Sequence, residues 1–153
     1  MRGHRLLAVA GAVALALAGC GGGASRQAAS GHASASRPLH LYRVTMNGRA
    51  ESPHGALHGV GAGVIAIHAG SVVCWRFAHL HGFVSATVAH IHTGPPGRSG
   101  PVLIPLSTAP VLHHQGCTHA TASAITAIER DPGGYYVNVH SARYPAGAVR
   151  GQL

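Results

Sequence analysis

Three histidines stand at positions from which they could bind a transition metal. His90 and His92 are separated by one residue in the alternating segment 86–92, and His140 ends the alternating segment 135–140. Residues two apart on a strand point to the same face, so His90 and His92 would project together. Imidazole nitrogens are common ligands of Zn and Cu. The spacing therefore predicts a Cu or Zn site made by His90, His92 and His140.

Other polar side chains share the faces that carry these histidines. Asn138 lies on the same strand face as His140, and Arg150 and Gln152 share one face of the segment 148–153. The opposite faces of all three segments are apolar. If those apolar faces form the core and the three strands are neighbours, the polar residues form one patch on the outer surface, with these members: His90, His92, Asn138, His140, Arg150 and Gln152.

A second interpretation needs no metal. The segment 93–101 reads TGPPGRSGP, a composition typical of a loop. In this interpretation the polar patch is a hydrogen-bond network that holds the loop, with His90 and His92 bonded to backbone groups and Arg150 assisting. The residue types are compatible with both interpretations.

The elements that must position these residues are short strands. From Pro38 onward, apolar or alternating runs are separated by Gly and Pro, a pattern typical of antiparallel sandwiches and barrels. The segment Ala122–Arg130, stopped by Pro132, predicts the one short helix. The predicted strands are residues 39–46, 59–68, 71–80, 86–92, 102–106, 135–140 and 148–153.

The N-terminus predicts export and lipid attachment. Residues 1–19 combine two arginines with an apolar stretch too short to span a bilayer, as in a signal peptide. They end in Leu-Ala-Gly before Cys20, which resembles a bacterial lipobox and implies cleavage before Cys20 and acylation of that residue. Residues 20–37 are rich in Gly, Ala and Ser and predict a flexible linker. The domain is then residues 38–153.

The two remaining cysteines, Cys74 and Cys117, predict a disulfide. An exported domain lies where disulfides persist, and an even pair of cysteines indicates a bridge more readily than a metal site. Two free buried thiols are the alternative.

The charge argues against a nucleic-acid partner. The net charge is +8 and all eleven basic residues are arginines. These arginines are spread along the chain and are not clustered with aromatic residues, whereas nucleic-acid binding favours such clusters. Diffuse positive charge suits an anionic membrane or a cell-wall polymer, and a protein partner also remains open.

Several ordered motifs give the chain a family resemblance. AHIH at 89–92, GPV at 100–102, YYVNVH at 135–140 and RGQL at 150–153 follow one another as in the CHRD domain, named for its occurrence in chordin. The resemblance covers residues 41–153 and departs at Ala148, where the family usually carries an acidic or polar residue. It implies an all-β, antiparallel Greek-key sandwich of immunoglobulin-like or superoxide-dismutase-like form, and it implies no defined activity.

The acidic residues argue against catalysis. The sequence holds three, Glu51, Glu129 and Asp131, and none lies in a histidine-bearing segment. A hydrolytic zinc site usually needs a carboxylate base, and a dismutase-like site needs a carboxylate ligand and a bridging histidine. We therefore predict no catalytic residue and disfavour a dismutase-like enzyme. The sequence predicts a lipid-anchored, non-catalytic binding or structural module on the extracytoplasmic side of the cell envelope, with Cu or Zn binding as the alternative function.

Overall fold

The structure is a computed structural model that describes residues 37–153. The predicted signal peptide, Cys20 and nearly all of the predicted linker lie outside the described residues. Within the described part of the chain, no helix is long and apolar enough to cross a membrane.

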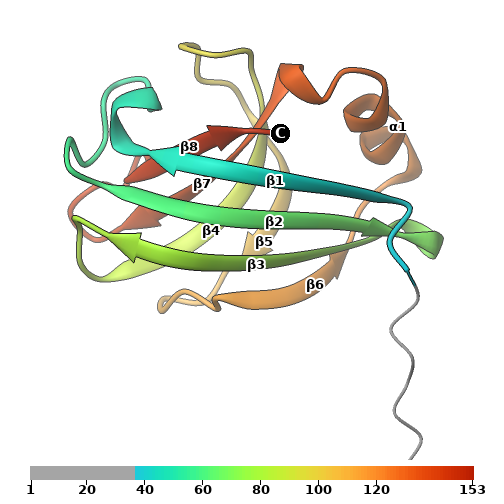
Figure 1. Cartoon of the computed structure of the whole chain (residues 1–153), viewed down its shortest axis with the longest axis horizontal. Coiled ribbons are helices and arrows are strands. Elements are labelled where there is room, and N and C mark those ends of the chain that lie inside the picture. Colours follow the sequence, from blue (N-terminus) through green and yellow to red (C-terminus); the bar gives the residue numbers. More distant parts are fainter. Residues whose placement is uncertain (1–36) are drawn as a thin grey trace, which may run out of the picture. The chain divides into compact units, whose positions relative to one another are not determined.

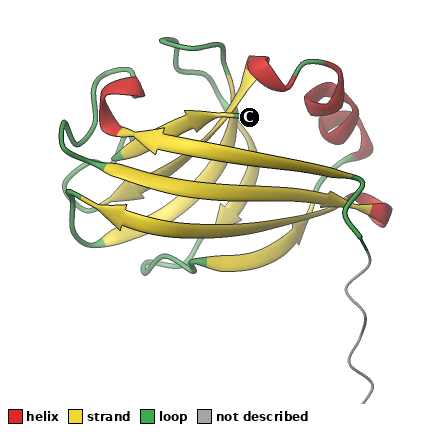
Figure 2. Cartoon of the chain, in the orientation of Figure 1, coloured by secondary structure: helices red, strands yellow, loops and turns green. Residues whose placement is uncertain are grey.

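In the described residues, eight strands form one antiparallel sheet (Figures 1 and 2). Its order is β5-β4-β7-β8-β1-β2-β3-β6, and every hydrogen-bonded pair is antiparallel. The edge strands β5 and β6 contact each other, so the sheet nearly closes into a barrel. The strand bounds are β1 His40–Asn47, β2 Val60–His68, β3 Val72–His81, β4 Ala86–Thr93, β5 Val102–Ser107, β6 Gln115–His119, β7 Tyr135–Ser141 and β8 Val149–Gln152.

The predicted mostly antiparallel β class with one helix is confirmed, whereas the two separate sheets of a Greek-key sandwich are not. All seven predicted strands are present within a few residues of their predicted ends. β6 was missed because Gln115–His119 has no apolar alternation. Gly116 lies under the Trp75 ring, where a side chain would collide. Contacts with neighbouring elements, and not its own residue pattern, therefore specify β6.

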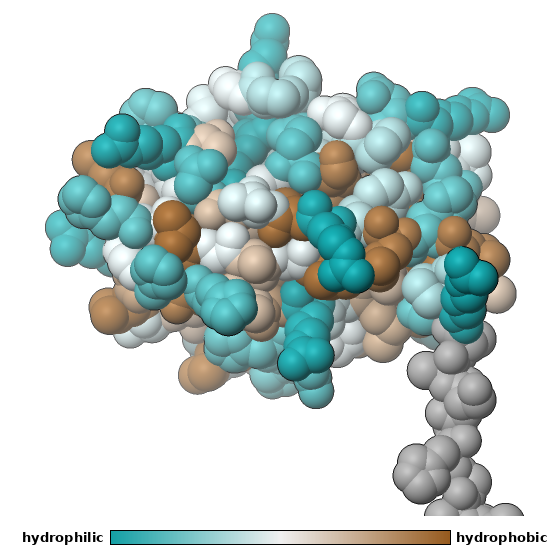
Figure 3. All heavy atoms as spheres, in the orientation of Figure 1, coloured by the Kyte–Doolittle hydropathy of each residue, from teal (hydrophilic) through white to brown (hydrophobic). Residues whose placement is uncertain are grey.

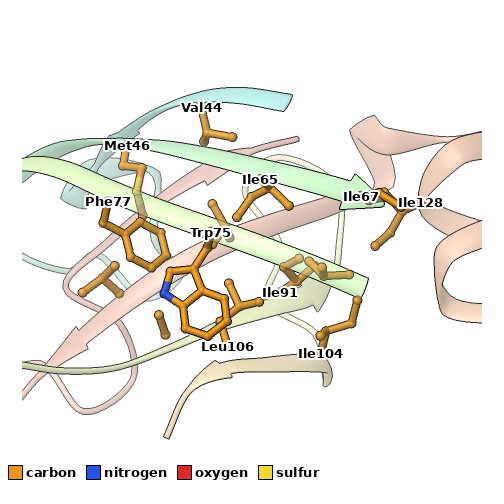
Figure 4. Packing of buried hydrophobic residues seen from close by; sticks show 14 of the residues in the cluster. Val44, Met46, Ile65, Ile67, Trp75, Phe77, Ile91, Ile104, Leu106 and Ile128 are labelled. Carbon is orange, nitrogen blue, oxygen red and sulfur yellow. The ribbon is translucent and has the colours of Figure 1, made fainter. Parts of the chain in front are cut away.

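Alternation of side chains along the strands fills the interior of the sheet. Ile65 and Ile67 on β2, Trp75 on β3 and Ile91 on β4 are all at most 6% exposed. Figure 4 shows these residues converging between the strands. On the outer face of β1 to β3, hydrophilic residues separate the apolar patches (Figure 3). The core therefore lies inside the curved sheet.

The predicted helix is α1, Ala122–Arg130. The Thr121 hydroxyl accepts a hydrogen bond from the Ala124 N–H at 3.2 Å and caps its first turn. Ile125 and Ile128 are buried and belong to the core cluster, and Ile128 lies beside Ile67 in Figure 4. The helix ends before Pro132, which begins the short 3-10 helix η3, Pro132–Gly134.

The predicted disulfide joins Cys74 of β3 to Cys117 of β6. The two residues are direct partners in the strand pairing, with their Cα atoms 4.0 Å apart. The bridge therefore ties the edge strand β6 to its only hydrogen-bonded neighbour.

Candidate metal centre

Three neighbouring strands bring the predicted polar residues together. β7 lies between β4 and β8 in the sheet. His90 of β4 pairs with Asn138 of β7, and Asn138 pairs with Arg150 of β8. Their side chains project from one face, while Ile91, Val137 and other residues of opposite parity are fully buried in the core. The sequence parity therefore predicted which side chains share a face.

The expected exposure of this face was wrong. His92 is 8% exposed, His140 is 7% exposed, and Asn138 and Arg150 are 1% exposed. Only His90 and Gln152 are partly accessible. Loops fold back over the polar face and replace water as hydrogen-bond partners. The site is thus a buried polar cluster under loops and not a surface patch.

The His92 ring is held with one nitrogen unpartnered. Its Nδ1–H donates to the carbonyl of Gly100 at 2.9 Å, because a carbonyl oxygen can only accept. The ring stacks on Tyr136 at 4.9 Å between centroids and 7° between planes. Nε2 is buried without a hydrogen-bond partner. A lone pair is therefore presented in a place that water does not reach.

A second backbone carbonyl orients His140. Its Nδ1–H donates to the carbonyl of Pro145 at 2.9 Å. In the neutral ring, Nε2 then carries a lone pair. That atom faces His90 Nδ1 at 3.2 Å and Asn138 Oδ1 at 3.1 Å.

One ring nitrogen from each of the three histidines lies within 4.8 Å of the other two. Zn–N bonds are about 2.0–2.1 Å long, so nitrogens around a tetrahedral ion stand about 3.4 Å apart. Binding of one tetrahedral ion would therefore need the nitrogens to approach one another by up to about 1.4 Å. The His90 and His140 rings meet edge to face, with centroids 5.0 Å apart. Face-to-face stacking between these two rings therefore does not oppose such a movement.

Burial keeps these imidazoles neutral. It lowers the pKa of His90 to about 4, with charge on His140 and His92 acting in the same direction. Burial also lowers the pKa of His140, although the bond to Pro145 partly opposes that shift. Neutral imidazole is the form that binds metal ions. At neutral pH both rings are therefore in the metal-binding form.

Arg150 and Gln152 perform the loop-holding role of the second interpretation. The Arg150 guanidinium donates to the carbonyls of Arg98 at 2.9 Å and Pro95 at 3.1 Å. It lies 3.4 Å from the centroid of the Tyr136 ring. Gln152 Nε2 donates to the carbonyl of Gly94 at 2.7 Å. Together with His92, these residues fasten both ends and the middle of the loop 94–100.

Sequence reasoning missed Glu51 as a member of the cluster. Glu51 directly follows the 3-10 helix η1, Gly48–Ala50, and is only 4% exposed. Asn138 hydrogen-bonds to its carboxylate. The other oxygen, Oε1, is buried without a partner in the described part of the chain. A side chain at Gly147 would overlap that oxygen. No sequence pattern near Glu51 indicates this burial, since it depends on contacts with distant segments.

Burial raises the pKa of Glu51 to about 7, against the smaller opposing effects of Arg150, Asn138 and the Ser52 backbone. Between pH 4.5 and 7 the folded protein therefore holds a proton at this residue that the unfolded chain releases. This contribution to stability is complete below pH 4.5 and is lost as the pH rises through 7. We expect Glu51→Gln to become progressively more stable relative to the wild type from pH 5 to pH 8. Urea unfolding at several pH values measures this difference.

The measurement compares Glu51→Gln with the wild type because His90 and His140 change the stability with pH in the opposite direction to Glu51. The lowered pKa of His90 gives stability that is complete above pH 6.5 and is lost as the pH falls toward 4, and the lowered pKa of His140 acts in the same direction. Both chains carry these histidines, so their effect cancels in the difference. Glu129→Gln removes one partly exposed carboxylate, 3.3 Å from the His40 ring, and controls for net charge. Parallel curves for the wild type and Glu51→Gln would contradict the assignment.

Comparison with known families matches residues 42–153 to the CHRD domain. No curated protein and no solved structure matched the chain. The matched range contains all eight strands except the first two residues of β1, together with every residue of the polar cluster.

Proposed function

The chain belongs to the CHRD domain family, and on that basis we propose that its domain is a non-catalytic extracytoplasmic module that binds one Cu or Zn ion through His90, His92 and His140. The family resemblance supplies the module but no activity, so the function has to be argued from the cluster itself.

The unpartnered Nε2 of His92 is the observation that carries the proposal. Buried polar atoms in folded proteins nearly always have a hydrogen-bond partner, and each exception requires an explanation. The Gly100 carbonyl accepts from Nδ1 and leaves the lone pair of the buried Nε2 available to an ion. His140 is fixed in the same way by Pro145. Backbone carbonyls that orient imidazole ligands are the usual outer-shell partners of metal sites.

The donor set suits a borderline or soft divalent ion. Three imidazole nitrogens and no carboxylate form the candidate ligand group, which favours Cu or Zn over Mg or Ca. The ligand group holds no carboxylate, which a dismutase-like site would need among its ligands. A bound ion would link β4 to β7 and would satisfy the nitrogen lone pairs.

We expect the full chain, purified in detergent, to bind one Cu(II) or Zn(II) ion in a calorimetric titration. The triple variant His90→Ala/His92→Ala/His140→Ala should bind more weakly by at least about 100-fold, because loss of an outer-shell partner alone costs about 10–100-fold. The matched control is His81→Ala/His114→Ala/His119→Ala, since these three histidines are exposed and lie outside the cluster.

The control variant should retain wild-type affinity. Uptake that is weak, involves several ions, or survives in the cluster variant would refute the metal site. The histidines would then serve only the loop-holding network, and a protein or cell-wall polymer would become the partner to seek.

The proposed location is the outer side of a cell membrane, with the chain anchored through a lipid on Cys20. The lipobox-like sequence before Cys20 supports this, and the Cys74–Cys117 disulfide is compatible with an oxidising compartment. Stable anchoring needs more than one acyl chain, which lipoprotein processing supplies. Mass spectrometry of the chain isolated from its membrane should find residue 20 as the acylated N-terminus. An unmodified Cys20, or a chain retaining residues 1–19, would refute the anchor.

A further inference from the structure

Glu51 determines the orientation of the amide that faces the histidine cluster. Glu51 in its ionised form can only accept hydrogen bonds, so the Asn138 amide nitrogen then points toward Glu51. The amide oxygen, Oδ1, is then left facing His140 Nε2 at 3.1 Å. The Asn138 side chain is fully buried between these two groups, so water cannot replace either of them as its hydrogen-bond partner.

This orientation of Asn138 places two hydrogen-bond acceptors, Asn138 Oδ1 and His140 Nε2, opposite each other. The Pro145 carbonyl requires the hydrogen of the neutral His140 ring to be on Nδ1, so Nε2 bears a lone pair. Asn138 Oδ1 and His140 Nε2 therefore face one another with no hydrogen between them, unless His140 becomes an imidazolium ion. A cation next to Nε2 turns this repulsion into attraction.

Glu51 also supplies a negative charge next to Asn138 of the cluster. Histidines bind a metal ion in their neutral form, so the ligands themselves bring no negative charge. The nearby Arg150 guanidinium is positive and 1% exposed. Of the three acidic residues, Glu129 pairs with His40 on β1, and Asp131 follows α1. Glu51 is hydrogen-bonded to Asn138. A divalent ion placed beside a buried arginine needs such a counter-charge, since buried charges are costly without one.

Local structure holds Glu51 in this position. Asn47 accepts a hydrogen bond from the Ala50 N–H at 2.9 Å and caps η1, which Glu51 directly follows. Gly147 has a φ of 140° and leaves space for the carboxylate, which a side chain there would occupy. The same segment supplies the Pro145 carbonyl to His140. Glu51 and His140 are thus positioned by one loop.

We propose that Glu51 is a positioning residue of the histidine cluster, which directs the Asn138 oxygen toward the bound ion and balances the charge of a divalent ion. This inference rests on the proposed function and adds to it that the site prefers divalent ions over monovalent ions. Loss of the Glu51 charge should weaken binding of Cu(II) and Zn(II) more than binding of the monovalent Cu(I).

The test compares Glu51→Gln with the wild type and with Glu129→Gln, all as full chains at pH 8. Gln keeps an oxygen that can accept from Asn138 and removes only the charge. We expect Glu51→Gln to lose at least tenfold in Cu(II) and Zn(II) affinity and to lose less in Cu(I) affinity. The Cu(II)/Cu(I) midpoint potential should therefore rise, by about 59 mV for each tenfold difference between the two losses. Glu129→Gln should match the wild type in both measurements.

Glu51→Asp tests whether a loss of affinity comes from impaired folding and not from the lost charge. It retains the charge on a shorter side chain, so its Cu(II) affinity should lie between those of the wild type and Glu51→Gln. Equal Cu(II) affinity of the wild type and Glu51→Gln, with an unchanged potential, would overturn this inference and leave the metal site intact. Weaker binding by Glu51→Asp than by Glu51→Gln would also overturn it. Absence of binding by the wild type would overturn both proposals.

Discussion

Replacing Arg150 with alanine should lower the free energy of unfolding by about 3–5 kcal/mol, because two carbonyls would each lose a hydrogen bond from a charged donor, worth about 1.5–3 kcal/mol. The guanidinium is 1% exposed and contacts the face of Tyr136 at 3.4 Å. It donates to two loop carbonyls, those of Pro95 and Arg98. Alanine would leave both acceptors without these donors, remove the contact with the ring and open a cavity under the loop. Urea unfolding at pH 7 measures the loss.

Two further variants separate the causes of this loss. Arg43→Ala removes an exposed arginine from β1 and should change stability by less than about 0.5 kcal/mol. Arg150→Lys keeps the charge but loses the planar fork that reaches two carbonyls at once, so it should recover only part of the loss. If Arg150→Ala costs no more than Arg43→Ala, the loop 94–100 does not depend on this network.

The sequence was sufficient to predict which side chains share a face. A strand alternates strictly, so the apolar set of Val137 and Val139 and the polar set of Asn138 and His140 follow from spacing alone. The CHRD resemblance was confirmed over nearly the predicted range. The disulfide followed from the number of cysteines and the predicted compartment.

Properties that depend on contacts distant in sequence could not be predicted. The burial of the polar face arises because the loop 94–100 folds back onto β8, some fifty residues away, and no local pattern encodes that contact. Glu51 enters the cluster from η1 and contacts Asn138, 87 positions later in the sequence. The single nearly closed sheet likewise depends on β6, a strand without apolar alternation that its neighbours define.

Removing the disulfide by Cys74→Ala/Cys117→Ala should lower the free energy of unfolding by about 4 kcal/mol at 25 °C. The chain-entropy model gives this value because the bridge joins residues 43 positions apart and restricts the unfolded chain. Cys117 is exposed and Cys74 is half-buried, so alanine at these positions leaves no deep cavity. The loss therefore reports on the crosslink and not on packing. Urea unfolding of the oxidised wild type and the double variant measures it.

The location of the bridge predicts where the structure would loosen first. β6 is an edge strand whose only hydrogen-bonded neighbour is β3, and the disulfide joins these two strands. Amide hydrogen exchange in the double variant should accelerate most in residues 115–119, while β7, in the middle of the sheet, should follow global unfolding. A reducing agent should bring the wild type to the stability of the double variant and leave the variant unchanged. An equal effect of the reducing agent on both proteins would show that the stabilisation does not come from this bridge.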